Sequence, residues 1–438
     1  MWQLWVRVRT YIGGQMWLRP ALASLGSVAL AATALWFGRL YNGPLPIELS
    51  DEALKSLLSI FASSMLAVAT FSVSAVVTAV SSVSNSTTPR ASRLVLADST
   101  TQNVLSSFIA AFIYSVIAIL ALEAYAFDRV GRFIIFVGLS AIVTWVLIAF
   151  VRWIDHVTKL GRVETGIEKI TDVALEAMTP SNVGTWGAHV YDGAPPAAAT
   201  VVAAREIGYV TELNVAGLHS LAERLGVAIY LRVRPGDFVD TKTPLAYLTP
   251  VSENVRANRN EVDEHIAITK GRVHGQDVRF GLINLAETAD RALSPGINDP
   301  GTAIAILGRQ LAVVTRWAEV SREKEAQEVR FDRVYVPPLK ASEIVRDCFT
   351  PIARDGAGAV EVGIRLQKTL GALVRLDVRD LTDAALEMSD EALFLAEQSL
   401  VAETQKERVR AAAKEVNRLA MADTDAERNH SMGEIINF

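Results

Sequence analysis

The sequence predicts an α-helical membrane protein in which four transmembrane helices are followed by a mixed α+β cytosolic domain. Three observations lead to this fold class. Four long apolar segments, nearly free of charged side chains, lie within the first 155 residues. Those residues carry 10 Lys and Arg against 7 Asp and Glu, whereas the rest carries 33 against 41, as a soluble domain does. In that charged part, short strand patterns with a Pro-Gly turn precede apolar residues at helical spacing, which predicts a small β-rich module and then a helical C-terminal part.

The four predicted spans have lengths that suit a hydrocarbon core of about 30 Å. They cover residues 22–37, 54–84, 104–126 and 133–153, within a transmembrane domain of residues 1–155. An even number of spans places both termini on one side, where eight Lys and Arg lie near the span ends against four on the other side. The positive-inside rule then predicts a multi-pass protein of the cell inner membrane with both termini in the cytoplasm.

The second span carries a continuous stripe of small, mostly polar side chains. Residues 56–88 contain no charged side chain, and nine positions within them follow one another at intervals of three or four residues. At about 100° per residue, these positions fall within roughly 100° of arc on an α-helix. The opposite face is apolar apart from Ser72. The stripe consists of Ser56, Ser59, Ser63, Ala67, Thr70, Ser74, Thr78, Ser81 and Asn85.

Two interpretations of the stripe stay open. Small residues and hydroxyl groups let transmembrane helices approach closely and hydrogen-bond, so the stripe could pack against a neighbouring helix. A packing face, however, usually concentrates its small residues over a few turns. This stripe runs roughly 43 Å, more than the hydrocarbon thickness, as the lining of a water-filled path through an oligomer must. In either case we expect the hydroxyls to face protein or water, because lipid cannot satisfy them.

Both ends of the striped helix are polar. Pro89 makes continuation past the inner end unfavourable, and Arg90 follows it directly. Acidic residues lie at the outer end, where rings of them in an oligomer would attract cations. A solvated loop is the alternative explanation, and Lys55 weakens the negative field. The three acidic residues of this outer mouth are Glu48, Asp51 and Glu52.

The remaining chain divides into four segments. Residues 156–180 keep helical spacing and are expected to form a connecting stalk helix. Residues 200–250 read as the small β-rich module, because strand patterns there flank a helix and a Pro-Gly-Asp turn. Residues 256–422 predict a mainly helical cytosolic domain, and residues 423–438 a loose polar tail.

Two polar clusters stand out in the helical part. In the second, a Pro-Gly pair stops one helix, and Asp299 can cap the next, which begins at Pro300. Its oxygen-bearing side chains could alternatively hold an ion. The first cluster could brace the second or face a neighbouring subunit. The first comprises Arg272, Gln276 and Asp277, and the second comprises Arg291, Ser294, Asn298 and Asp299.

These clusters carry a resemblance to a known family. Residues 292–303 read A-L-S-P-G-I-N-D-P-G-T-A, preceded over residues 276–282 by Q-D-V-R-F-G-L. Both stretches resemble the predicted bacterial membrane proteins grouped as domain of unknown function twenty-two fifty-four. That family resembles this chain over nearly its full length, with four membrane helices before a soluble domain. Its hairpin loop resembles the segment here that contains Pro89, Arg90, Asp98 and Gln102. The resemblance implies family membership and implies no activity.

Several function classes lack support in the sequence. The chain has no phosphate-binding loop, dinucleotide fingerprint or nucleophile elbow, and its six histidines show no ligand spacing, so we expect neither a cofactor nor a metal site. No large basic patch predicts nucleic-acid binding. Without a catalytic constellation, the sequence leans away from an enzyme.

Besides an enzyme, two other functions are compatible with the sequence. The stripe favours a homo-oligomeric ion channel or pore, with cations preferred and with the cytosolic domain assembling or gating it. The expected partners are then the lipid bilayer, other copies of the chain and inorganic ions. The alternative is a membrane-anchored sensor or scaffold whose cytosolic domain binds a ligand or partner, with the stripe used only for packing.

Overall fold

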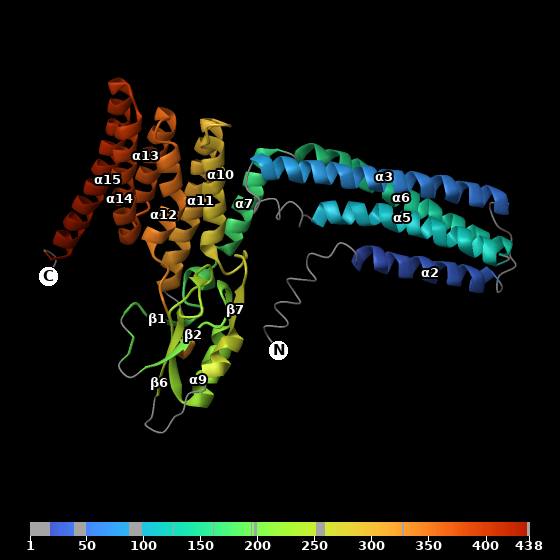
Figure 1. Cartoon of the computed structure of the whole chain (residues 1–438), viewed down its shortest axis with the longest axis horizontal. Coiled ribbons are helices and arrows are strands. Elements are labelled where there is room, and N and C mark those ends of the chain that lie inside the picture. The colour runs from blue at the N-terminus through green and yellow to red at the C-terminus, as the bar shows by residue number, and fades with distance from the viewer. Residues whose placement is uncertain are drawn as a thin grey trace. The chain divides into compact units, whose positions relative to one another are not determined.

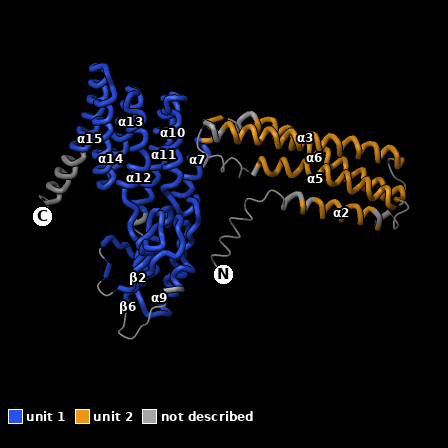
Figure 2. Tube along the Cα trace, in the orientation of Figure 1, with its two compact units in different colours: residues 1–7, 86–88, 167–438 blue, residues 8–85, 89–166 orange. Residues whose placement is uncertain are grey.

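The computed structural model consists of two compact units, which are described separately (Figure 2). It describes residues 18–38, 50–86, 99–125, 127–160, 162–193, 195–196, 199–250, 259–325 and 328–435. Among these residues, the membrane unit comprises those from 18 to 85 and from 99 to 166, and the C-terminal unit comprises residue 86 and those from 167 to 435.

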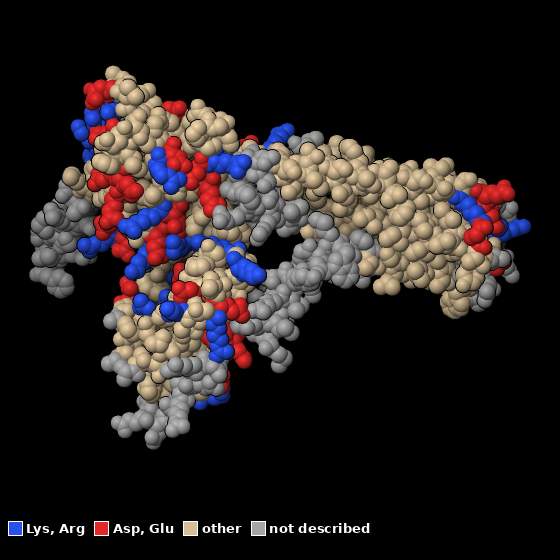
Figure 3. Space-filling model, viewed as in Figure 1, with Lys and Arg blue, Asp and Glu red and all other residues tan. Residues whose placement is uncertain are grey.

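The described residues of the membrane unit form four helices that lie side by side (Figure 1). Three of them are long and apolar enough to cross a bilayer, whereas the apolar stretch described in α2 is shorter, from Ser24 to Ala34. In the view of Figure 3, the long middle of this unit shows no charged side chain. The helices are α2 (Leu18–Gly38), α3 (Asp51–Ser86), α5 (Ser99–Ala124) and α6 (Arg129–Leu160).

Apolar side chains from one face of α3 hold the unit together. Leu54 and Leu58 are fully buried in a cluster with side chains of α5 and α6, and Met65 and Val76 belong to a second cluster around Phe108. Lipid tails are as apolar as these side chains, so the contact stabilises the unit through close van der Waals packing and not through transfer out of water. The apolar face predicted from the 3.6-residue period is therefore the face that packs inside the unit.

Each observed membrane helix is longer than the span that the sequence predicts. The α3 helix begins at Asp51, and α6 continues from Arg129 to Leu160. The extra turns contain charged and polar side chains. Hydropathy leaves these residues out of a predicted span, although they form helix readily. A separate helix, α7 (Val163–Ala177), follows α6, so the predicted stalk of residues 156–180 contains the end of α6 and the whole of α7.

The β-structure of the C-terminal unit forms two sheets. One has the strand order β1-β8-β4-β6-β2, and the other has the order β5-β3-β7. Their inner faces enclose a common apolar core with α9, which is capped by Asn214 and ends at Gly226 in the left-handed conformation. The elements are β1 (Ala188–Val190), β2 (Thr200–Ala203), β3 (Gly208–Leu213), α9 (Val215–Leu225), β4 (Val227–Leu231), β5 (Phe238–Val239), β6 (Pro244–Pro250), η1 (Arg259–His265), β7 (Ile266–Thr269) and β8 (Phe331–Val336).

The sheets extend beyond the predicted module of residues 200–250. Strand β8 pairs in parallel with both β1 and β4, with Tyr335 opposite His189 on one side and Tyr230 on the other. The three aromatic rings stack at centroid distances of 4.9 and 4.3 Å. Strand β7 likewise pairs with β3 across more than fifty residues of chain. Such pairing is set by tertiary contacts, because local sequence patterns do not specify long-range partners.

The helices of the C-terminal part pack in two layers (Figure 1). Helices α10, α12 and α14 contact one another in succession, as do α11, α13 and α15. The final helix continues through most of the segment predicted as a loose tail. The short helix α8 (Pro180–Val183) precedes β1, and the others are α10 (Val278–Leu293), α11 (Pro300–Glu325), α12 (Ala341–Asp355), α13 (Val360–Val374), α14 (Arg379–Ser399) and α15 (Glu403–Ile435).

Candidate functional site: the polar face of α3 and a groove beside it

The stripe of α3 lies on the outer surface of the membrane unit. Eight of its nine side chains are exposed, from Ser56 to Ser81, whereas the side chain of Asn85 lies outside the described residues. The buried positions of the helix, such as Leu58 and Met65, occupy the opposite face. None of these eight side chains is therefore used for packing within the unit. The predicted common orientation of the stripe agrees with this pattern of exposure.

The hydroxyl groups of the stripe are hydrogen-bonded within their own helix. Ser63 donates to the carbonyl oxygen of Ser59 at 2.9 Å, and Thr70 donates to that of Leu66 at 2.9 Å. Ser74 and Thr78 likewise donate to the carbonyl oxygen four residues earlier, at 3.2 and 3.0 Å. These bonds satisfy the hydroxyl protons without any partner molecule. These hydroxyls therefore need a neighbouring helix or water less than the sequence predicts, because their own helix already accepts their protons.

The exposed face of α3 also contains apolar side chains. Ile60 and Val77 are 66% and 59% exposed, and at about 100° per residue they fall inside the arc of the stripe. Phe71, which is 68% exposed, flanks it. The face is therefore small and polar along its middle line and apolar at its margins.

Charged residues at the N-terminal end of α3, the predicted outer mouth, are partly neutralised by ion pairs. The Arg132 guanidinium donates to the Asp51 carboxylate at 2.8 Å, and Lys55 pairs with Glu123. Glu52 is exposed, and Glu48 lies outside the described residues. Because Asp51 is paired with a cation from α6, it contributes less to a ring of negative charge than the sequence predicts.

The predicted inner loop falls mostly outside the described residues. Pro89, Arg90 and Asp98 belong to that part, whereas Gln102 lies on α5 and is 8% exposed.

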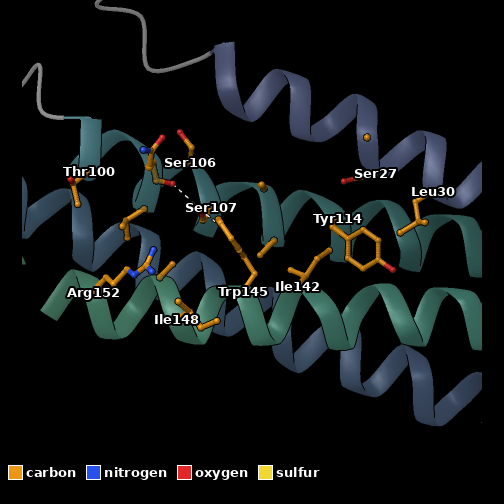
Figure 4. Close-up of a pocket in the computed structure, with 16 residues that line it drawn as sticks. Ser27, Leu30, Thr100, Ser106, Ser107, Tyr114, Ile142, Trp145, Ile148 and Arg152 are labelled. Atoms are coloured by element: carbon orange, nitrogen blue, oxygen red, sulfur yellow. Dashed lines mark hydrogen bonds between the residues drawn. The ribbon is translucent and has the colours of Figure 1, made fainter.

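A groove that the sequence analysis missed lies between α2, α5 and α6 (Figure 4). Its volume is about 840 Å³. Arg152, Thr100 and Ser107 lie toward one end, and Tyr114 and Leu30 toward the other (Figure 4). Thr100, Asn103 and Ser107 follow one another at intervals of three and four residues, so one polar face at the start of α5 was visible in the sequence. Its position opposite Arg152 of α6 required the packing of the helices.

The first polar cluster of the C-terminal unit builds a helix start. Asp277 is the N-cap of α10 and accepts hydrogen bonds from the backbone N–H groups of Arg279 and Phe280. Its carboxylate also accepts two bonds from Arg272, at 2.8 and 2.9 Å. Burial raises the pKa of this carboxyl, and the Arg272 guanidinium opposes that shift. Gln276 instead bonds the backbone N–H and carbonyl of Leu213, which ties the helix start to β3.

The turn after β4 closes over this cluster. Gly236 has a φ of 102°, and a Cβ atom there would lie 2.6 Å from Nη2 of Arg272 and 2.7 Å from the Asp277 carboxylate. Only glycine allows both the backbone conformation and the close approach. The predicted Pro-Gly-Asp turn therefore packs directly against the predicted cluster of Arg272 and Asp277.

The second polar cluster lies at the other end of α10. Ser294 donates to the carbonyl oxygen of Arg291 at 2.6 Å, and Asn298 adopts a φ of 51° in the loop. Asp299 accepts bonds from the N–H and the hydroxyl of Thr302, in the first turn of α11. The helix-punctuation interpretation accounts for these contacts. Because α10 has 16 residues, about 24 Å of helix separates this cluster from Asp277, so the two do not form one site.

A buried arginine beside the first cluster was not anticipated. Arg234 is 7% exposed and lines a polar pocket of about 240 Å³. It donates to the carbonyl oxygens of Pro337, Asn182 and Gly184, at 2.7, 2.6 and 3.0 Å. Burial lowers its pKa to about 10, so it stays charged at neutral pH. A charged residue directly before a Pro-Gly turn was the only sign of it in the sequence.

We expect a pH-dependent stability contribution from Asp290 on α10. Burial, with Asp355 nearby, raises its pKa to about 6, while Arg354 opposes the shift. The folded state therefore binds this proton more tightly than the unfolded chain, and stability falls as pH rises from about 4 to about 6. Replacing the carboxylate by an amide, Asp290→Asn, should stabilise the unit at pH 7 by about 1 to 3 kcal/mol and have little effect at pH 4.

Urea unfolding of the full-length protein at both pH values, followed by hydrogen exchange in α10, measures this effect. The exposed carboxylate Glu391 on α14 provides the control substitution Glu391→Gln. An equal gain in stability at pH 4 and pH 7 would contradict the assignment.

Comparisons with known proteins extend over most of the chain. The family model described as "Predicted membrane protein (DUF2254)" matches residues 13–372. Uncharacterized proteins Mb1321c of Mycobacterium bovis and Rv1290c of Mycobacterium tuberculosis are each 32% identical over 123 residues, which cover 27% of this chain and 24% of the relative. The match thus spans about a quarter of the length of these curated relatives. No solved structure matches the chain.

Proposed function

The chain belongs to the DUF2254 family of predicted membrane proteins, and on that premise we propose that it is a homo-oligomeric ion-conducting pore lined by the stripe of α3. The C-terminal unit would assemble or gate the pore. The observation that carries the proposal is the exposure of all eight described stripe side chains along a helix whose opposite face is buried.

The length of the exposed stripe supports a water path. Between Ser56 and Ser81 it extends about 38 Å, which exceeds a hydrocarbon core of about 30 Å. No charged side chain interrupts it. Hydroxyl oxygens keep an acceptor lone pair after donating to their own helix, so they can still replace part of an ion's hydration shell without trapping the ion.

The exposed face favours contact with another copy of the chain. Small side chains at its middle line permit close approach of a second helix, and apolar side chains such as Ile60 and Phe71 at its margins could pack between neighbouring copies. Cation preference is carried mainly by Glu52, because Asp51 is paired with Arg132. The charge distribution still favours an orientation in which both termini lie in the cytoplasm.

Two adjacent serines provide a matched test. Ser63 and Ser64 are both exposed, and each donates to the carbonyl oxygen four residues back, at 2.9 and 2.8 Å. Ser63 lies in the stripe, whereas Ser64 lies about 100° further round the helix. In planar bilayers containing the purified full-length protein, Ser63→Leu should lower the unitary conductance by roughly tenfold or more, because a leucine narrows and dehydrates the path. Ser64→Leu should leave it nearly unchanged.

Two results would reject the pore. One is the lack of any conductance from the wild-type protein, and the other is an equal response to both substitutions. Labelling distinguishes a wet from a dry face: cysteines placed at positions 63, 70, 74 and 78, after replacement of Cys348, should react with membrane-impermeant thiol reagents.

A sensor or scaffold is the second candidate function. It is favoured by the polar pocket beside Arg234. In that region Arg279 forms ion pairs with Asp347 and Glu343. Lys340 forms an ion pair with Asp192. This function predicts an oligomer or monomer without conductance, in which the stripe cysteines stay unreactive.

A further inference from the structure

The geometry points to the groove between α2, α5 and α6 as a binding site for an anionic phospholipid, with the phosphate at Arg152 and one acyl chain along α5. This inference concerns a different face of the membrane unit and does not depend on conduction. The groove has a volume of about 840 Å³, and the lining residues that the structure describes all belong to the membrane unit.

Arg152 supplies the cation of this groove. It is exposed, and among the residues that the structure describes it makes no hydrogen bond or ion pair. The lining side chains that the structure describes include no carboxylate, so the groove carries a net positive charge. An unpaired arginine next to apolar surface in a membrane helix is costly unless an anion or water neutralises it. A lipid phosphate is the anion that a bilayer offers at this depth.

The depth of Arg152 matches the headgroup level. It lies 23 residues after Arg129, the first residue of the apolar stretch of α6, which corresponds to about 34 Å along the helix. That distance slightly exceeds a hydrocarbon core of about 30 Å, so with Arg129 at one interface Arg152 reaches the other. Trp145, which is 60% exposed, lies two turns deeper on the same groove wall and donates to Ser107 at 3.1 Å.

The groove changes from polar to apolar along its length (Figure 4). Thr100 lies near Arg152, and Ile142, Leu30 and Tyr114 lie further along. Tyr114 donates its hydroxyl proton to the carbonyl oxygen of Ile135 at 2.8 Å, so its polar atom is already satisfied. From Thr100 to Tyr114 the groove follows about 21 Å of α5, enough to cross one leaflet of about 15 Å and its headgroup zone. An amphiphile with a phosphate and an acyl chain fits both properties.

Native mass spectrometry of the full-length protein tests this assignment. Purified protein is exposed to equal amounts of phosphatidylglycerol and phosphatidylcholine, and we expect retained adducts to be mainly phosphatidylglycerol. The charge-removing substitution Arg152→Gln should weaken that retention about fivefold, the effect of one basic residue near a lipid surface. The control is Arg129→Gln at the opposite end of α6, which should leave retention unchanged. Circular dichroism verifies the helix content of both variants.

The position of the acyl chain needs a second measurement. Phosphatidylglycerol with a photoreactive acyl chain should crosslink to the peptides that contain Tyr114 or Ile142, and Ala110→Leu, which fills the groove, should suppress this crosslink. Water-soluble glycerol phosphate should not compete, because the headgroup alone lacks the chain contacts. Equal retention of the two lipids, retention that is insensitive to Arg152→Gln, or crosslinks confined to α3 would overturn the inference. Lipid retention that rises when residues 1–17 are deleted would assign the groove to that segment instead and would equally overturn it.

Discussion

Replacing Asp277 by alanine should destabilise the start of α10 by about 3 to 5 kcal/mol, the usual cost of removing one partner from a buried ion pair. The Asp277 side chain is 1% exposed and that of Arg272 is 16% exposed, so water cannot take over the role of the lost carboxylate. The substitution also removes the acceptor for the N–H groups of Arg279 and Phe280. Urea unfolding of the full-length protein, read by hydrogen exchange in peptides from residues 278–293, measures the loss.

The matched control is the other capping aspartate. Asp299 is exposed, and its carboxylate accepts bonds from the N–H and the hydroxyl of Thr302. The substitution Asp299→Ala should therefore cost about 1 kcal/mol, the typical value of an N-cap. Comparable losses at both positions would show that the Arg272 pair adds nothing to the cap.

The substitution Gly281→Ala should separate α10 from α7. A Cβ atom at Gly281 would lie 2.5 Å from Cβ and 2.9 Å from Cα of Ala174. Because the second of these is a backbone atom, no change of rotamer relieves the clash. Overpacking costs about 1 to 3 kcal/mol, and the gain of about 1 kcal/mol from the helix propensity of alanine does not offset a backbone clash. We expect a net loss of up to about 2 kcal/mol and faster hydrogen exchange in α7.

A second helical glycine tests the cause of this loss. At Gly308 on α11, a Cβ atom would meet only Nη2 of Arg365, at an ordinary distance of 3.5 Å. The substitution Gly308→Ala should stabilise α11 by up to about 1 kcal/mol. If both alanines stabilise the protein, the close approach of α7 and α10 is not what requires glycine at position 281.

Local sequence patterns predict the helices of this chain better than they predict the pairing of its strands. The periodicity of residues 54–84 predicted both the α3 helix and its buried face, because one side must be apolar to pack. The Pro-Gly pair at residues 295–296 and the capping residue Asp299 likewise predicted the end of α10 and the start of α11. The joining of β8 to β1 and β4 was not predictable in the same way, since strand partners depend on contacts across more than a hundred residues.

The candidate sites divide in a similar manner. That the stripe of α3 forms one polar face follows from spacing alone, whereas the groove at Arg152 needs three helices in contact. The hydrogen bonds from stripe hydroxyls to carbonyl oxygens of the same helix were also missed, because side-chain rotamers decide them.

The sequence by itself determined that this chain is a membrane protein, which segments are apolar, and which face of α3 is polar, because composition and helical period are local properties of the chain. Only the tertiary structure decided that the polar face points outward, that Asp51 is neutralised by Arg132, and that Arg152 lies beside an open groove. These three facts depend on which helices pack together. Packing is selected by the fit of whole apolar surfaces, and no single segment of the sequence specifies it.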